Sequence, residues 1–199
     1  VETEDCINFP DRSMTGLSQH RDSIPACARE QAAAFLKEAH AQTAEYLMKK
    51  FAINFQQVRL VVSWTLPHLR ELIGYRSTAT GSTIKIEAGM MTHVSSSEMF
   101  DLPKQRLGEY EFIANDPEIG SFAQQTTWAC LLRTYLHEAA HTADIRSGKN
   151  LPNDLDRLVN EEREIFKATA EPPHGHGPLW SAIYRDLVRS TTLLSADAN

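Results

Sequence analysis

The sequence predicts a single α+β domain in which a small sheet packs against several helices. Three observations support this prediction. An alanine-rich segment, 26–51, repeats its apolar residues with the period of an α-helix, and later segments do the same. Between the helical segments lie short runs that are rich in β-branched residues or alternate between apolar and polar residues, as strands do. The 199 residues are enough for one domain with a substantial core.

The N-terminal half contains the predicted sheet. Residues 1–25 are polar and irregular, so we expect an arm there, followed by the helix 26–51 and the rest of the domain, 26–199. The strands that we expect after this helix are 58–64, a weaker candidate at 73–77 and, beyond a turn at 80–82, 83–87. We expect these strands to form a small antiparallel sheet.

The C-terminal half is predicted to be helical. Residues 91–122 form a long, mixed segment, and loops of this length in a compact domain are often functional. Three helices follow, at 126–146, 155–168 and 179–194; the second is charged, and the other two have an apolar face. The first of them is the most apolar. Gly148 is placed to end it, since glycine commonly follows the last turn of a helix.

Composition excludes some functions more clearly than it suggests one. The formal net charge is −6, which argues against a general electrostatic affinity for nucleic acid. No apolar run approaches the roughly 20 residues that span a bilayer, and no signal-peptide pattern is present. None of the three cysteines, Cys6, Cys27 and Cys130, forms a C-x-x-C pair. We expect reduced thiols and a cytoplasmic location, with a Cys6–Cys27 disulfide as the alternative.

The helix 126–146 carries the pattern H-E-x-x-H at His137, Glu138 and His141. Histidines four residues apart lie one turn apart on one helix face, so both imidazoles can reach one ion. In such a motif the histidines bind Zn²⁺ and the glutamate takes a proton from the water that the metal activates. Two histidines and a glutamate would be costly in an apolar helix without a partner. The motif therefore predicts a zinc site with Glu138 as general base.

The third ligand has two main candidates. Glu161 follows His141 at the spacing of thermolysin-type zinc proteases, but it lies in a charged run that is typical of a solvated surface. His176 stands between Gly175 and Gly177, just before Pro178, where the backbone bends into a new helix. His174 is a weaker candidate in the same segment. The residues alone leave this choice open.

The segment Gly175-His176-Gly177-Pro178-Leu179-Trp180 closely resembles the third-ligand segment of SprT-like (Spartan-type) zinc metallopeptidases. Upstream, Val61-Val62-Ser63-Trp64, Leu69-Arg70, Gly74-Tyr75-Arg76 and 81–86 resemble that family's three-strand sheet, in order. The resemblance covers roughly residues 40–190. It implies a zincin-like fold and His137, His141 and His176 as zinc ligands. Relative to the family pattern, the chain carries insertions near 91–122 and 142–175, and we expect neither the zinc ribbon of some members nor a basic tail.

The expected function is therefore zinc-dependent hydrolysis of peptide bonds in a protein or peptide substrate. Tyr135, Tyr184 and Arg185 are candidates for stabilising the oxyanion, although each fits a packing or surface role better. The alternative function is a zincin-fold interaction module of a larger assembly with little or no protease activity. Nucleic acid is not an expected partner. The residues that could nonetheless form a basic patch are Lys49, Lys50, Arg59, Arg70 and Arg76.

Overall fold

The structure is a computed structural model of the whole chain that describes residues 26–64, 78–88, 116, 118–119, 127–148, 150–167 and 175–191. Several predictions fall outside these residues and stay predictions. They are the arm 1–25, the weak strand 73–77, the segments of the SprT resemblance between 65 and 77, most of the long segment 91–122, His174, and the pairing of Cys6.

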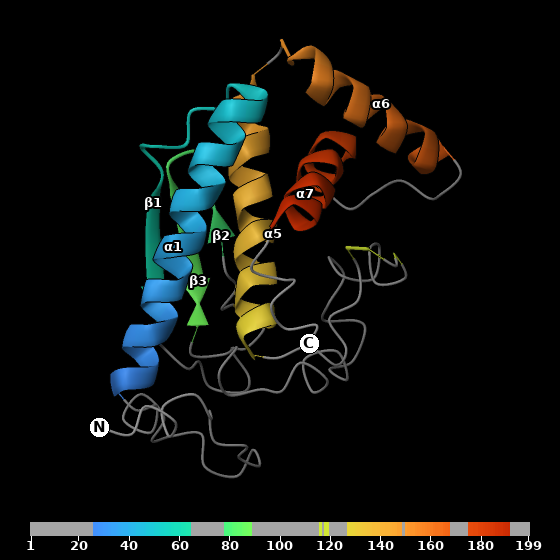
Figure 1. Cartoon of the computed structure of the whole chain (residues 1–199). Helices are drawn as coiled ribbons and strands as arrows, with labels where there is room; N and C mark the ends of the chain where they lie inside the picture. Colours follow the sequence, from blue (N-terminus) through green and yellow to red (C-terminus); the bar gives the residue numbers. More distant parts are fainter. Residues whose placement is uncertain are drawn as a thin grey trace.

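The described residues form an α+β fold (Figure 1). The helices are α1 (Ala26–Phe51), α5 (Thr127–Ser147), α6 (Asn153–Lys167) and α7 (Pro178–Ser190). The strands are β1 (Arg59–Ser63), β2 (Thr78–Ala79) and β3 (Thr83–Glu87). Helices α1 and α5 lie alongside one another with the sheet packed against them, while α7 packs against both α5 and α6 (Figure 1). Helix α5 is thus the central element. None of the described helices is both long and apolar enough to cross a membrane.

The sheet is mixed, so the expected antiparallel sheet is wrong for its main pair. Strand β3 lies in the middle and pairs with β1 in parallel, with Arg59 opposite Thr83 and Ser63 opposite Glu87. Only the two-residue β2 runs antiparallel to β3. A parallel pair needs a long connection, and residues 64–82 separate β1 from β3. An antiparallel pair can be joined by a tight turn, and residues 80–82 join β2 to β3. Alternation of apolar residues predicts a strand but carries no information about its direction.

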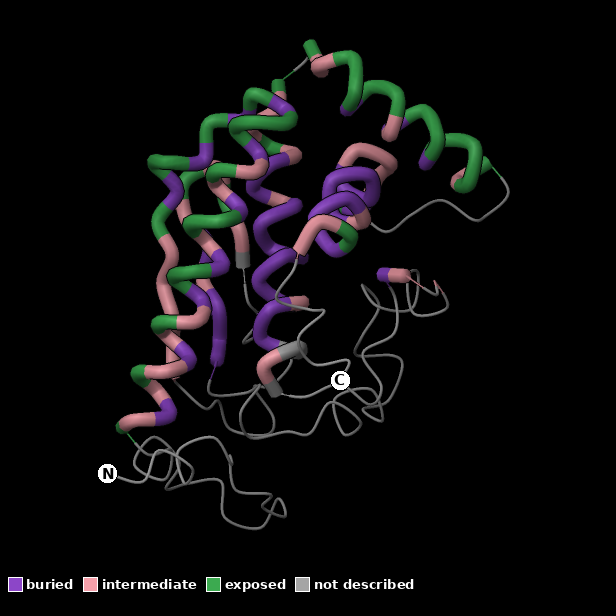
Figure 2. Tube along the Cα trace, viewed as in Figure 1, coloured by how far each residue is buried: buried purple, intermediate pink, exposed green. Residues whose placement is uncertain are grey.

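The helix boundaries follow the apolar pattern closely. The bounds of α1 are those predicted from the sequence, and its buried residues recur every three or four positions, from Ala28 to Phe51 (Figure 2). The predicted helix 179–194 ends earlier, at Ser190. There the hydroxyls of Ser190 and Thr191 both donate to the carbonyl oxygen of Leu187 (3.0 and 2.7 Å). Such side-chain bonds compete with the helical ones and favour a helix end.

A buried polar contact connects α5 to α1 and to the start of β1. His40 Nε2 donates to the carbonyl oxygen of Val58 (2.9 Å). A neutral imidazole has one N–H, so His40 Nδ1 accepts from the hydroxyl of Tyr135 (3.0 Å). Burial lowers the pKa of His40, which keeps it in this neutral form. The contact fixes the position of α5 two residues before His137.

Candidate metal centre

Helix α5 supplies two of the three histidines of the candidate site. From Leu131 to Ala140 nearly every described side chain is buried, because α1, α7 and the sheet surround this part of the helix (Figure 2). His137 and Glu138 are buried within it, and His141 is half-buried. Polar side chains in so apolar a place are costly unless they have partners. Their position therefore indicates a binding site, in which a ligand can be a partner of these side chains.

The segment before α7 supplies the third histidine. Gly175 has φ 88°, a left-handed conformation that glycine adopts without strain. A Cβ at this position would lie 3.6 Å from Cε1 of His141, so the backbone also passes close to that ring. Gly177 is extended and Pro178 begins the helix, where proline's fixed φ is favourable. His176, between them, is 1% exposed and lies against the α5 histidines.

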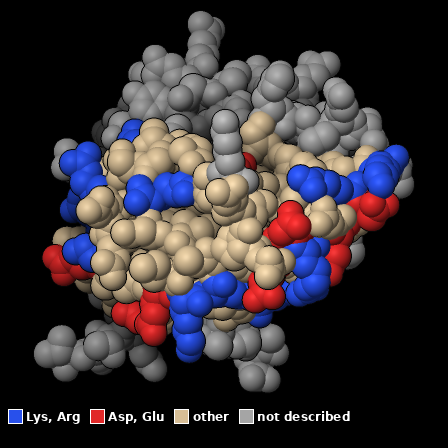
Figure 3. Space-filling model, turned by 90° about the horizontal axis from the view of Figure 1, so that it is seen from above, with Lys and Arg blue, Asp and Glu red and all other residues tan. Residues whose placement is uncertain are grey.

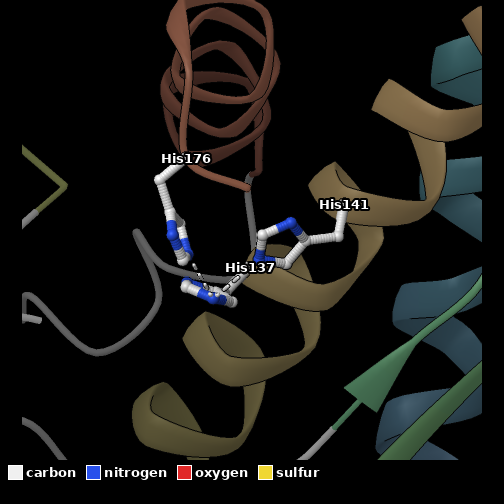
Figure 4. A group of neighbouring side chains, drawn as sticks. All are labelled: His137, His141 and His176. Atoms are coloured by element: carbon white, nitrogen blue, oxygen red, sulfur yellow. Dashed lines mark hydrogen bonds between the residues drawn. The ribbon is translucent and has the colours of Figure 1, made fainter. Parts of the chain in front are cut away.

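The three Nε2 atoms converge from two elements (Figure 4). Nε2 of His137 lies 3.2 Å from Nε2 of His141 and 3.3 Å from Nε2 of His176. One Nε2 cannot donate to one partner and accept from another at the same time, so hydrogen bonding does not account for both contacts. Zinc–nitrogen bonds of about 2.05 Å at a tetrahedral angle separate two ligand nitrogens by about 3.3 Å. The residues therefore fit a tetrahedral metal ion.

The electrostatics of the site favour the ligand form of the histidines. Burial, with a smaller effect from His141 and His176, holds the pKa of His137 well below its usual value. Burial and the nearby His176 lower the pKa of His141 to about 4. Both imidazoles are therefore neutral near pH 7, and a neutral imidazole has the lone pair that binds a metal.

Aromatic side chains of α7 form one wall of the site. The ring of Trp180 is fully buried, and its centroid lies 4.4 Å from that of His176 and 4.9 Å from that of His137. Its Nε1 donates to the carbonyl oxygen of His137 (3.3 Å). The Tyr184 ring packs against both Trp180 and His137. This wall fixes where α7, and hence His176, lies against α5.

Of the two third-ligand candidates that the structure describes, Glu161 and His176, it brings His176 to the α5 pair. Glu161 lies on the exposed side of α6, where its carboxylate pairs with Arg157 at 2.5 Å. Among the described residues, His137, His141 and His176 form a group whose ligand atoms all lie within 4.8 Å of one another. No fourth His, Cys, Asp or Glu of the described residues joins them. An ion held by this group would keep an open position.

The candidates for oxyanion stabilisation lie in packed or ion-paired positions. The Tyr135 hydroxyl bonds to His40, on the α1 side of the helix. Tyr184 is fully buried against Trp180 and His137, and burial raises its pKa to about 12 against a smaller opposing effect of Arg133. Arg185 lies in an ion-pair network with three carboxylates. Both tyrosines therefore have the packing role that the sequence favoured, whereas Arg185 is largely buried and is not a surface residue.

The sequence reasoning did not single out Arg133. This residue lies one turn before His137, on the same face of α5, and its Nη1 donates to the carbonyl oxygen of Glu118 (3.0 Å). The available signal was an arginine within an apolar helix, in register with both motif histidines.

The candidates for a basic patch lie in different surroundings. Of the five candidates for a basic patch, Lys50 pairs with Asp186 at 2.6 Å, Lys49 and Arg59 are exposed, and two lie outside the described residues. On the face viewed from above, basic side chains are separated by uncharged surface and interspersed with acidic ones (Figure 3).

The described structure thus defines an α+β protein with a buried three-histidine group that can hold a metal ion. No protein-family model, curated protein or solved structure matches the chain. The chemistry of the site therefore has to be inferred from its own geometry.

Proposed function

We propose that this chain is a zinc-dependent metallopeptidase with a zincin-like fold of the SprT-like kind. The observation that carries the proposal is the convergence of three Nε2 atoms, two from an H-E-x-x-H helix and one from the start of α7. Structural zinc sites usually have four protein ligands, whereas catalytic sites have three and leave one position open. Three histidines with Glu138 in the motif favour the catalytic kind.

The choice of zinc follows from the ligands. Neutral imidazoles suit zinc, copper, nickel and iron, while magnesium and calcium prefer oxygen ligands. Zinc is a Lewis acid without redox chemistry, which suits it to hydrolysis. When bound, zinc would lower the pKa of its water and polarise the scissile carbonyl.

Glu138 then acts as the proton carrier in this proposal. It follows His137 directly in α5, and its buried position excludes competing solvent from the carboxylate. It would take a proton from the attacking water and pass it to the leaving amine. Trp180 and Gly175 have a different role, since they hold the ligand rings and do not meet the substrate in this proposal.

Two measurements test the proposal together. Purified protein should contain one zinc per chain and should cleave an unfolded substrate such as denatured casein. Glu138→Gln should retain zinc and fold but lose cleavage, because glutamine keeps the size of the side chain and cannot accept the proton. His141→Ala serves as the variant that loses the metal.

The outcomes separate the alternatives. Zinc at full stoichiometry with no cleavage of any unfolded protein would support the interaction module of a larger assembly. Cleavage that is as fast in Glu138→Gln as in the wild type would show that Glu138 is not the base.

A further inference from the structure

A largely buried arginine, Arg185, connects α7 to two other parts of the chain. Arg185 Nε donates to Glu162 of α6 (2.7 Å), and its Nη2 donates to Asp116 (2.8 Å). Its Nη1 donates to both Asp116 (3.1 Å) and Glu118 (2.9 Å). The side chain is 11% exposed, so these bonds form largely away from water. A guanidinium is suited to this role because it presents several donors in one plane.

Two carboxylates of this network, Asp116 and Glu118, are held in their charged form. Burial would raise the pKa of Asp116, but hydrogen bonds from Arg185 and from the amides of Glu118 and Ile119 outweigh it and lower the pKa. A hydrogen bond from Arg189, followed by one from Arg185, lowers the pKa of Glu118 against the effect of burial. At neutral pH Asp116 and Glu118 are therefore charged partners of Arg185.

Asp116 and Glu118 are bound from both α5 and α7. Arg185 of α7 binds the carboxylates of Asp116 and Glu118, while Arg133 of α5 binds the carbonyl oxygen of Glu118. Ile119, next to Glu118, is buried in the core. These residues thus bridge α5 and α7 without using any atom of the three histidines.

We propose that Arg133 and Arg185 are positioning residues of the metal centre, which hold α5 and α7 at the separation at which His176 meets the α5 histidines. We call Arg133, Arg185, Asp116, Glu118 and Ile119 the arginine clamp. The inference rests on the proposed metal site. It adds that the site is arranged before the ion binds, by contacts outside the ligands.

The physical need for such a clamp lies in the histidines themselves. Histidines from two separate parts of the chain can bind one ion only if their Nε2 atoms are held close together. The Nε2 separations of 3.2 and 3.3 Å depend on how α7 lies against α5. Packing of Trp180 determines part of this arrangement, and the arginine clamp adds contacts that are directional and charge-assisted.

The test measures metal binding, not activity. The variants are Arg185→Gln, Arg133→Gln and the milder Asp116→Asn. The side-chain oxygen of asparagine can still accept the hydrogen bonds from the backbone N–H groups of Glu118 and Ile119. Zinc affinity is measured by competition with a chelator, and site geometry by the visible absorption spectrum of the Co²⁺-loaded protein. Both are read well below the unfolding temperature of each variant.

The matched control is Lys50→Gln. Lys50 pairs with Asp186, the neighbour of Arg185 on α7, and connects α7 to α1 instead of to the clamp. Its loss should also destabilise the protein. We expect the zinc Kd to rise roughly tenfold in Arg185→Gln and Arg133→Gln, less in Asp116→Asn, and under about twofold in Lys50→Gln, by analogy with changes around metal ligands. The Co²⁺ spectrum should change only in the clamp variants.

Three results would overturn the inference in distinguishable ways. Unchanged zinc Kd and Co²⁺ spectra in the clamp variants would show that the clamp serves stability alone. A zinc affinity that merely follows the unfolding temperature across all variants, including Lys50→Gln, would also show that the clamp serves stability alone. The milder Asp116→Asn variant allows this comparison even if Arg185→Gln fails to fold. A wild type that binds neither zinc nor Co²⁺ would instead refute the metal centre itself.

Discussion

Replacing Gly175 by alanine should weaken zinc binding, although no atom occupies the space of the new methyl group. At φ 88°, a residue with a Cβ is strained by about 1–2 kcal/mol. The added Cβ would lie 3.6 Å from Cε1 of His141, an ordinary van der Waals distance, so no clash adds to this cost. The strain is relieved most directly by a rotation of the backbone at 175, and that rotation displaces His176.

Binding of the ion must then restore the strained conformation. If the whole strain opposes binding, the zinc Kd rises roughly fivefold to thirtyfold, which corresponds to about 1–2 kcal/mol. Isothermal titration with zinc in the presence of a chelator measures this change. The matched control is Gly148→Ala, because Gly148 also has a positive φ (70°), follows the last residue of α5 and has nothing within 4 Å of its built Cβ.

The control variant should lose stability without losing zinc affinity. An equal fall in unfolding free energy in both variants, with the wild-type zinc Kd in each, would refute the reasoning. It would mean that the segment before α7 keeps its left-handed conformation with alanine, and that Gly175 does not determine the position of His176.

Three further predictions concern the ligand choice, acid stability and nucleic acid. His176→Ala should lose bound zinc, whereas Glu161→Gln should retain it by elemental analysis, and the reverse pattern would show that Glu161 is the ligand. Folding lowers the pKa values of Asp116 and Glu118. Their contribution to stability is therefore fully present when the pH is above the pKa values of the unfolded chain, and it is lost as the pH falls through the pKa values of the folded protein. Urea unfolding below about pH 4.5 should therefore show a weaker pH dependence in Arg185→Gln than in the wild type, and equal slopes would contradict the paired charges. With a net charge of −6, DNA binding at about 0.15 M salt should be no tighter than roughly 10⁻⁴ to 10⁻⁶ M by fluorescence anisotropy, and submicromolar, salt-sensitive binding would overturn this.

Local sequence determined the helices and half of the candidate site. The apolar period of 26–51 predicted α1 at its observed bounds, because a helix with one buried face must repeat its apolar residues at that period. The spacing of His137 and His141 likewise requires no tertiary information, since a helix places residues four apart on one face.

Tertiary structure decided what depends on elements that meet at a distance. The parallel pairing of β1 and β3 depends on the path of the connection between them, which side-chain alternation does not encode. The third ligand was open because Glu161 and His176 both follow the motif in sequence, and only the packing of α7 on α5 brings His176 to the pair.

The arginine clamp was the feature that the sequence predicted least. Arg133 and Arg185 come from two helices and both bind Glu118, whereas an arginine on a helix is usually a solvated side chain. By itself the sequence determined the helices, the motif and the chemistry of the ligands, because these depend on neighbours one turn away. Which residues face each other across the core was decided by packing, because contacts between distant segments form only when the whole chain excludes water from one common interior.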